Sequence, residues 1–231
     1  MKAFQFNTTP GIRFGSDYSV STAEEVSKKL GKKILFVTDP GLVKIGLHEK
    51  TITELQKYSE IIIFDNVEAD PSIKTLMDCV QQGRDFDATG VIGFGGGSSM
   101  DVSKLTALLI GSNENIHEAW GVANAKGPRL PLALYPTTSG TGSEVTPISI
   151  ITQEDLEKKG VSSPIILPDL AILDPILTLG LPPHITAATG IDAMVHAIES
   201  YASKSVNNNL ISKTLAKEAL KLLGGSIRQA V

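Results

Sequence analysis

Short runs of β-branched and aromatic residues alternate with longer amphipathic segments through the first half of the chain. The runs at residues 33–38, 60–65 and 89–94 have apolar centres, ILFV, IIIF and VIGF, which is typical of strands buried on both faces of a parallel sheet. Segments 21–30 and 71–83 carry apolar residues at helical spacing. This alternation predicts an α/β domain in which helices cover a parallel sheet.

The pattern changes after about residue 180. Two prolines lead into a long predicted helix over residues 184–203, and a second helix is expected over residues 209–223. We therefore expect an α/β domain at 1–180 and the beginning of an all-helical domain at 181–231. Two helices cannot bury a core of their own, and the chain stops just after an amphipathic helix, so we expect the helical domain to be incomplete.

The composition argues against a nucleic-acid-binding, membrane-bound or disulfide-bonded protein. A formal net charge of −4 and few aromatic residues give no basis for binding nucleic acid or an anionic membrane. Cys79 is the only cysteine, so no intrachain disulfide can form, and its helical context predicts a small buried hydrophobe. No apolar run approaches the length of a membrane span. These features predict a cytoplasmic protein.

A glycine-rich run, GGGSS at residues 95–99, joins a predicted strand to a predicted helix. Glycines allow close approach of a ligand, and the free N–H groups at the start of the following helix favour an anion. We therefore interpret Gly96, Gly97 and Ser98 as a pyrophosphate site. The alternative is a tight turn that needs glycine for steric reasons alone, and Asp101 in the first turn has a structural explanation in the helix dipole.

Two further loops follow predicted strands. Residues 136–144, which include Thr137 and Thr138, are rich in hydroxyl groups and glycine and suit a ribose–phosphate chain. Asp39 ends the strand at 33–38, where a carboxylate can accept both hydroxyl groups of an adenosine ribose and repel a 2′-phosphate. Ordinary loop composition and an Asp-Pro-Gly turn are the respective alternatives.

The long helix after residue 180 carries a possible metal site. Asp192 and His196 are four residues apart and share one helical face, with Glu199 on the same side. A carboxylate and an imidazole suit Fe²⁺ or Zn²⁺, but two ligands do not make a catalytic site, and a surface ion pair is the alternative. The other three histidines are interpreted as solvated: His48, His117 and His184.

Taken together, these motifs resemble the iron-containing (group III) alcohol dehydrogenase family. The matching stretches occur in the family's order and spacing over nearly the whole chain. They are VTDPGL, GFGGGSSMDVSK, YPTTSGTGSEVT, SSPIILPDLAILDP and TAATGIDAMVHAIESY.

The resemblance implies a Rossmann-like domain that binds NAD(P), followed by an all-helical domain that holds one divalent metal in the cleft between them. Asp39 would select NAD over NADP, and Asp192 and His196 would be the first two metal ligands. Lys158, or its neighbour Lys159, would contact the cofactor. The full set of implied cofactor residues is Asp39, Gly96, Gly97, Ser98, Asp101, Thr137, Thr138 and Lys158.

The sequence departs from the family pattern in two ways. Asp70 stands where the family commonly has Asn, in a loop near the cofactor, and its carboxylate changes the local charge. The family's remaining two metal ligands are histidines well downstream, and no histidine follows His196.

The implied activity is NAD-linked interconversion of a small primary alcohol and its aldehyde, with Fe²⁺ as a Lewis acid and a homodimer as the typical assembly. A zinc-dependent polyol dehydrogenase of the glycerol type is one alternative. The other is a non-catalytic NAD-binding fragment, because two metal ligands are missing. No general base can be named from the residues.

Overall fold

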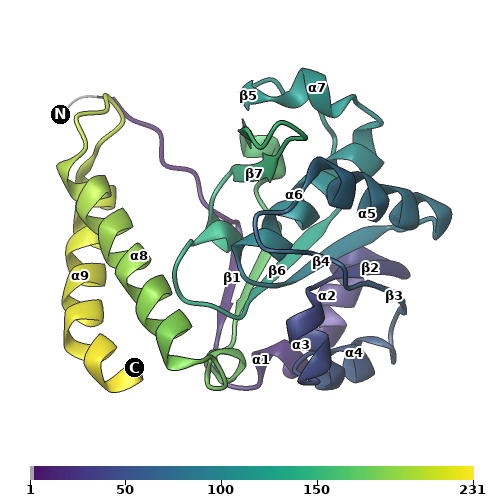
Figure 1. Ribbon diagram of the computed structural model, residues 1–231, viewed down its shortest axis with the longest axis horizontal. Coiled ribbons are helices and arrows are strands. Elements are labelled where there is room, and N and C mark those ends of the chain that lie inside the picture. Colours follow the sequence, from purple (N-terminus) through teal and green to yellow (C-terminus); the bar gives the residue numbers. More distant parts are fainter. Residues whose placement is uncertain (1–2) are drawn as a thin grey trace. The chain divides into compact units, whose positions relative to one another are not determined.

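The computed structural model describes residues 3–231 and contains a six-stranded parallel sheet in the order β1-β9-β6-β4-β2-β3 (Figure 1). Each neighbouring pair of strands is parallel. The sheet confirms the predicted α/β class. Its strands are β1 (Gly11–Phe14), β2 (Lys33–Val37), β3 (Glu60–Phe64), β4 (Gly90–Gly95), β6 (Leu132–Pro136) and β9 (Leu170–Leu173).

Alternate residues of the central strands enter two separate cores, one on each face of the sheet. On β2, Leu35 packs with residues of the two helices that follow β3 and β4, whereas Ile34 and Phe36 pack with the helix that precedes β2. Figure 1 shows α5 and α6 on one side of the sheet and α2 to α4 on the other. The helices are α1 (Tyr18–Ser21), α2 (Ala23–Leu30), α3 (Pro40–Lys44), α4 (Glu49–Leu55), α5 (Ile73–Asp85), α6 (Gly97–Ser112) and α7 (Ile116–Ala119).

Two buried side chains bear on the sequence predictions. Cys79 is fully buried against α6, as predicted, and burial raises the pKa of its thiol to about 12. His48 is buried as well, so the prediction that it is solvated was wrong. His48 lies one and two turns before Ile52 and Leu55 on the inward face of α4, and its ring lies 6.4 Å from that of Phe36.

A second, three-stranded sheet has the order β5-β8-β7, with β7 antiparallel to β8. It was not predicted from the sequence. Its strands are β5 (Gly121–Val122), β7 (Ile148–Thr152) and β8 (Lys158–Ser162), and three 3-10 helices lie nearby in the chain, η1 (Ser143–Val145), η2 (Pro164–Ile166) and η3 (Pro175–Thr178).

The chain divides into two compact units, and the sheets belong to the larger one, residues 8–137 and 143–177. The smaller unit contains the described residues 3–7, 138–142 and 178–231.

In the smaller unit, α8 (Pro183–Ala202) and α9 (Leu210–Ala230) pack against each other. A methyl group on Gly190 would lie 2.6 Å from Ile227, so glycine allows the two helices to approach closely. Asn209 begins α9 in a reciprocal capping box with Ser212. Within residues 3–231, no helix is long and apolar enough to cross a membrane.

Candidate functional site

Three loops follow the neighbouring strands β2, β4 and β6 at the carboxyl edge of the large sheet. Asp39 lies after β2, Gly96 after β4 and Thr137 after β6. The backbone N–H of Thr137 donates to the carbonyl of Gly95 at 3.0 Å, which joins the second loop to the third. Ligands of open α/β sheets bind at this edge, and these three predicted cofactor residues lie there.

The glycine-rich run makes a turn that only glycine fits. Gly95 has φ +152°, and a methyl group there would lie 2.6 Å from Oγ of Ser99. Gly96 is the N-cap of α6 and makes no side-chain capping bond, and the first intrahelical bond in this turn runs from Met100 N–H to Gly96. The N–H groups of Gly97 and Ser98 therefore lack intrahelical acceptors, which is the arrangement that binds phosphate.

Asp39 is both a helix cap and a neighbour of the glycine turn. Its Oδ1 accepts a hydrogen bond from the N–H of Leu42 at 3.0 Å, which caps α3. Its Oδ2 lies 3.4 Å from the position that a methyl group on Gly95 would occupy. Asp39 therefore has a structural role as the cap of α3, where the sequence alternative was an Asp-Pro-Gly turn, and its Oδ2 faces the glycine turn.

Asp101 lies beyond the first turn of α6, so its predicted place in that turn was wrong. Both of its carboxylate oxygens accept hydrogen bonds inside the protein. Oδ1 accepts from Oγ of Ser143 at 2.7 Å, and Oδ2 accepts from the N–H of Ile150 at 3.0 Å. Lys104, three residues further along α6, is fully buried and donates to Ser143 and to the carbonyl of Ile148, both at 2.7 Å. Sequence reasoning missed Lys104 and Ser143. Their signal was a lysine one turn after Asp101 in an otherwise apolar helix.

Burial dominates the electrostatics of this cluster. It lowers the pKa of Lys104 to about 8, although the carboxylates of Asp101 and Glu144 favour the charged lysine. Burial also raises the pKa values of Asp101 and Glu144 above their usual range, and the charge of Lys104 opposes both shifts.

The remaining predicted cofactor residues are Thr137, Thr138 and Lys158. Thr137 is buried, while Thr138 is half-buried and begins the segment that groups with the smaller unit. Lys158, at the start of β8, donates to Oδ1 of Asp70 at 2.6 Å. The lysine implied by the family resemblance is thus paired with the residue that departs from the family pattern.

Asp192 and His196 lie one turn apart on α8, with Nε2 of the imidazole 3.7 Å from Oδ1 of the carboxylate. About half of each side chain is exposed. In the described part of the chain, no three histidine, cysteine or acidic residues come together to hold a metal. The two predicted ligands are therefore adjacent, without a third.

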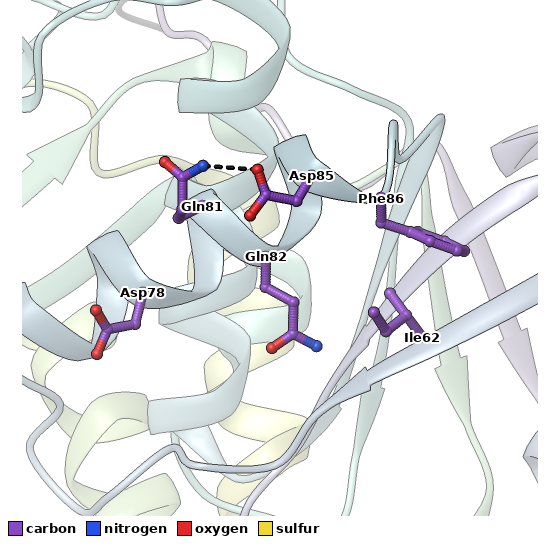
Figure 2. Close-up of a pocket in the computed structure, with 6 residues that line it drawn as sticks. All are labelled: Ile62, Asp78, Gln81, Gln82, Asp85 and Phe86. Atoms are coloured by element: carbon purple, nitrogen blue, oxygen red, sulfur yellow. Dashed lines mark hydrogen bonds between the residues drawn. The ribbon is translucent and has the colours of Figure 1, made fainter.

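A hollow of about 400 Å³ lies elsewhere, on the outer face of α5 beside β3 (Figure 2). Its polar groups are already bonded within the protein, since Gln81 donates to Asp85 at 2.8 Å and Gln82 donates to the carbonyl of Ile63 at 2.8 Å. None of the predicted site residues contributes to it. Its lining is Ile62, Asp78, Gln81, Gln82, Asp85 and Phe86.

The open parallel sheet, with its glycine turn and an acidic strand end at the carboxyl edge, defines a Rossmann-like α/β protein. Residues 9–175 match the family model for iron-containing alcohol dehydrogenase, and residues 186–231 match the model for the C-terminal part of the Fe-containing alcohol dehydrogenase family. The chain belongs to the iron-containing alcohol dehydrogenase family.

Curated relatives and solved structures agree with this assignment. The chain is 39% identical to sulfoacetaldehyde reductase of Bilophila wadsworthia, over 99% of this chain and 59% of the relative. It is 44% identical to long-chain-alcohol dehydrogenase 1 of Geobacillus thermodenitrificans, over 88% of this chain and 52% of the relative. Sulfoacetaldehyde reductase from Bifidobacterium kashiwanohense in complex with NAD⁺ superposes with a TM-score of 0.90 at 30% identity, over all of this chain and 61% of that one. The chain thus spans little more than half the length of these relatives.

Proposed function

We propose that this chain binds NAD at the N-terminus of α6 and that the whole protein interconverts a small primary alcohol and its aldehyde. The observation that carries the proposal is the approach of Asp39 Oδ2 to the glycine turn, beside N–H groups that lack intrahelical acceptors. Family membership and a related reductase in complex with NAD⁺ support it.

In this proposal, different residues of the chain bind different parts of the cofactor. The N–H groups of Gly97 and Ser98 and the positive end of the α6 dipole bind the pyrophosphate, with Gly96 leaving room for it. Asp39 accepts hydrogen bonds from the adenosine ribose and repels the 2′-phosphate of NADP. Thr137 and Thr138 line the adenine and phosphate end, and Lys158 offers its ammonium group to the cofactor.

Asp192 and His196 are the proposed first ligands of a divalent metal, for which we favour Fe²⁺ because of the family. Their donor set, one carboxylate oxygen and one imidazole nitrogen, fits such an ion, and further ligands have to complete the site. When bound, the metal would act as a Lewis acid toward the substrate oxygen. The proposed cofactor residues Asp39, Gly96 and Thr137 lie on loops at one edge of the sheet, whereas two metal ligands are proposed among the described residues.

The substrate class is a primary alcohol or its aldehyde. The relatives named above are a sulfoacetaldehyde reductase and a long-chain-alcohol dehydrogenase. Their substrates share the alcohol or aldehyde group that reacts, whereas the rest of the substrate differs. A homodimer and a cytoplasmic location belong to the same proposal, and the buried free thiol of Cys79 suits a reducing compartment.

An anaerobic assay with Fe²⁺ tests this function. The whole protein, loaded with iron, is expected to reduce NAD⁺ with ethanol or 1,3-propanediol, and His196→Ala is expected to abolish turnover and lower the iron content while NADH still binds. The same assay on the 231-residue chain distinguishes an enzyme from a cofactor-binding fragment. Iron-loaded whole protein that binds NADH and turns over no primary alcohol or aldehyde would contradict the proposal.

A further inference from the structure

Lys104 is the one lysine among the fully buried large side chains of the described residues, and the proposed function gives it no role. Its ammonium group is held by two short hydrogen bonds, to the hydroxyl of Ser143 and to the carbonyl of Ile148. Burying a charge is costly unless it is paired and hydrogen-bonded. We therefore look for a function that explains a buried charge on α6.

The contacts of Lys104 show which parts of the structure it joins. Ser143 belongs to η1, after the loop that follows β6, and Ile148 is the first residue of β7. Asp101 reinforces the same connection, because it accepts from Ser143 and from the N–H of Ile150, and its carbonyl accepts from the hydroxyl of Ser149 at 2.9 Å. The first turns of α6 are thereby fixed to η1 and to β7.

Lys104 also lies on the helix whose N-terminus forms the proposed phosphate site. Lys104 follows Gly97 by seven residues, which is about 10 Å along a helix at 1.5 Å per residue. Helical side chains lean toward the N-terminus, and Nζ lies 3.8 Å from Oδ1 of Asp101, one turn back. Its positive charge is thus nearer to the start of α6 than its Cα is.

We propose that Lys104 is a positioning residue for the pyrophosphate of the cofactor, which holds the start of α6 in place and adds a buried positive charge behind the N–H groups of Gly97 and Ser98. This inference rests on the proposed NAD site. Lys104 touches neither cofactor nor substrate, so its effect is on binding of the diphosphate and not on the chemical step.

The titration of Lys104 makes the proposal testable without any substitution. Burial lowers the pKa of Lys104 to about 8, so the ammonium charge is present at pH 7 and largely lost by pH 9. A dianionic ligand favours the charged form, and its affinity therefore falls as pH rises through about 8. The charged groups that act on Lys104 are Asp101 on its own helix and Glu144 on η1, while its contacts on β7 are neutral.

The experiment measures NADH binding by fluorescence between pH 7 and 9.5, together with displacement of NADH by ADP and by adenosine. In the unchanged chain, NADH and ADP are expected to weaken roughly three- to tenfold across this range, as a unit charge about 10 Å away would cause, while adenosine keeps its affinity. Lys104→Met is expected to bind NADH at pH 7 as weakly as the unchanged chain does at pH 9.5, with a flat profile. Lys104→Arg keeps its charge throughout and is expected to restore tight, pH-independent binding. The charge of Lys104 opposes the raised pKa values of Asp101 and Glu144, so any slope that remains in Lys104→Met belongs to those two carboxyl groups and not to Lys104.

The possible results separate this inference from the proposed function. An unchanged chain that binds NADH with the same affinity from pH 7 to 9.5 overturns the role of Lys104 and leaves the NAD site standing. Equal losses of ADP and adenosine binding in a folded Lys104→Met protein show a general structural role, which also overturns it. An unchanged chain that does not bind NADH at any pH overturns the proposed function and, with it, this inference.

Discussion

The two oxygens of Asp39 have different surroundings. Oδ1 accepts from the N–H of Leu42 and caps α3, while Oδ2 faces the turn at Gly95. The cap needs only a hydrogen-bond acceptor, but the proposed discrimination against NADP needs a negative charge. A single substitution can therefore separate the two roles.

Asp39→Asn keeps the acceptor and removes the charge. Since asparagine caps helices as well as aspartate does, the melting temperature should stay close to that of the unchanged chain. Preference for NADH over NADPH is expected to fall on the order of tenfold, because repulsion of the 2′-phosphate is lost. Titrations with both cofactors measure this ratio, and an unchanged ratio would show that Asp39 is only a helix cap.

Gly95→Ala tests the turn itself. Its φ of +152° strains any residue with a side chain, and the added methyl group would overlap Oγ of Ser99. We expect a loss of about 1–3 kcal/mol in the free energy of unfolding, with weaker NADH binding. Gly160→Ala is the matched control, since a methyl group there meets its nearest neighbour at an ordinary 3.5 Å. Equal effects of the two substitutions in urea denaturation and NADH titration would contradict the special geometry of Gly95.

At the scale of elements, the parallel strands with strong apolar runs could be predicted. The runs at residues 33–38, 60–65 and 89–94 correspond to β2, β3 and β4 within a residue or two, because each has an apolar centre. β2 and β4 are buried on both faces, whereas β3 is an edge strand and is only partly buried. The hairpin of β7 and β8 could not be predicted, since its exposed face gives it a mixed composition. The helix at 209–223 extends further than predicted, to Ala230.

Only those residues of the candidate site that directly follow strands of the parallel sheet could be predicted from the sequence. Asp39, Gly96 and Thr137 follow neighbouring strands, so the parallel sheet brings their loops to one edge. A lysine on a largely apolar helix is a signal for Lys104, but the sequence does not show that its side chain turns inward to Ser143. The environment of a buried charge depends on contacts between distant segments, and these exist only after folding.

The pair of Lys158 and Asp70 joins the start of β8 to the loop before α5. Both side chains are more than half exposed, so the pair itself contributes little to stability. If Lys158 contacts the cofactor, Asp70 competes with the pyrophosphate for the same ammonium group. Asp70→Asn is therefore expected to tighten NADH binding about two- to fivefold at low salt, with the gain fading in high salt.

A double-mutant cycle decides whether that gain passes through the lysine. In a Lys158→Ala background, Asp70→Asn should have no effect on the dissociation constant of NADH. The same gain in both backgrounds would mean that Asp70 acts on the cofactor directly. No gain in the presence of Lys158 would remove Lys158 from the proposed site.

For the whole molecule, the proposed cofactor residues outnumber the proposed metal ligands. Three strand-end loops converge on the proposed NAD site, whereas Asp192 and His196 stand as a pair on α8. Several large apolar side chains of α8 and α9 are exposed, and the chain covers 52% to 61% of the lengths of the relatives described above. NAD binding is therefore the part of the proposed activity that experiments on this chain can test.

Metal binding by the 231-residue chain should accordingly be weak. Two ligands hold a divalent ion less firmly than the three or four of a complete site. Calorimetric titration with Zn²⁺ is expected to show an interaction that His196→Ala weakens by at least about tenfold, with NADH affinity unchanged. Tight binding that survives loss of His196 would show that the metal is held by other residues.

An NADH titration of the unchanged chain at pH 7 in low salt tests whether the carboxyl edge of the sheet binds NAD. We predict saturable binding of one NADH per chain, tighter than that of NADPH, and displaced by ADP. Failure to bind NADH, or equal affinity for NADH and NADPH, would contradict the assignment of the glycine turn and Asp39 as the cofactor site.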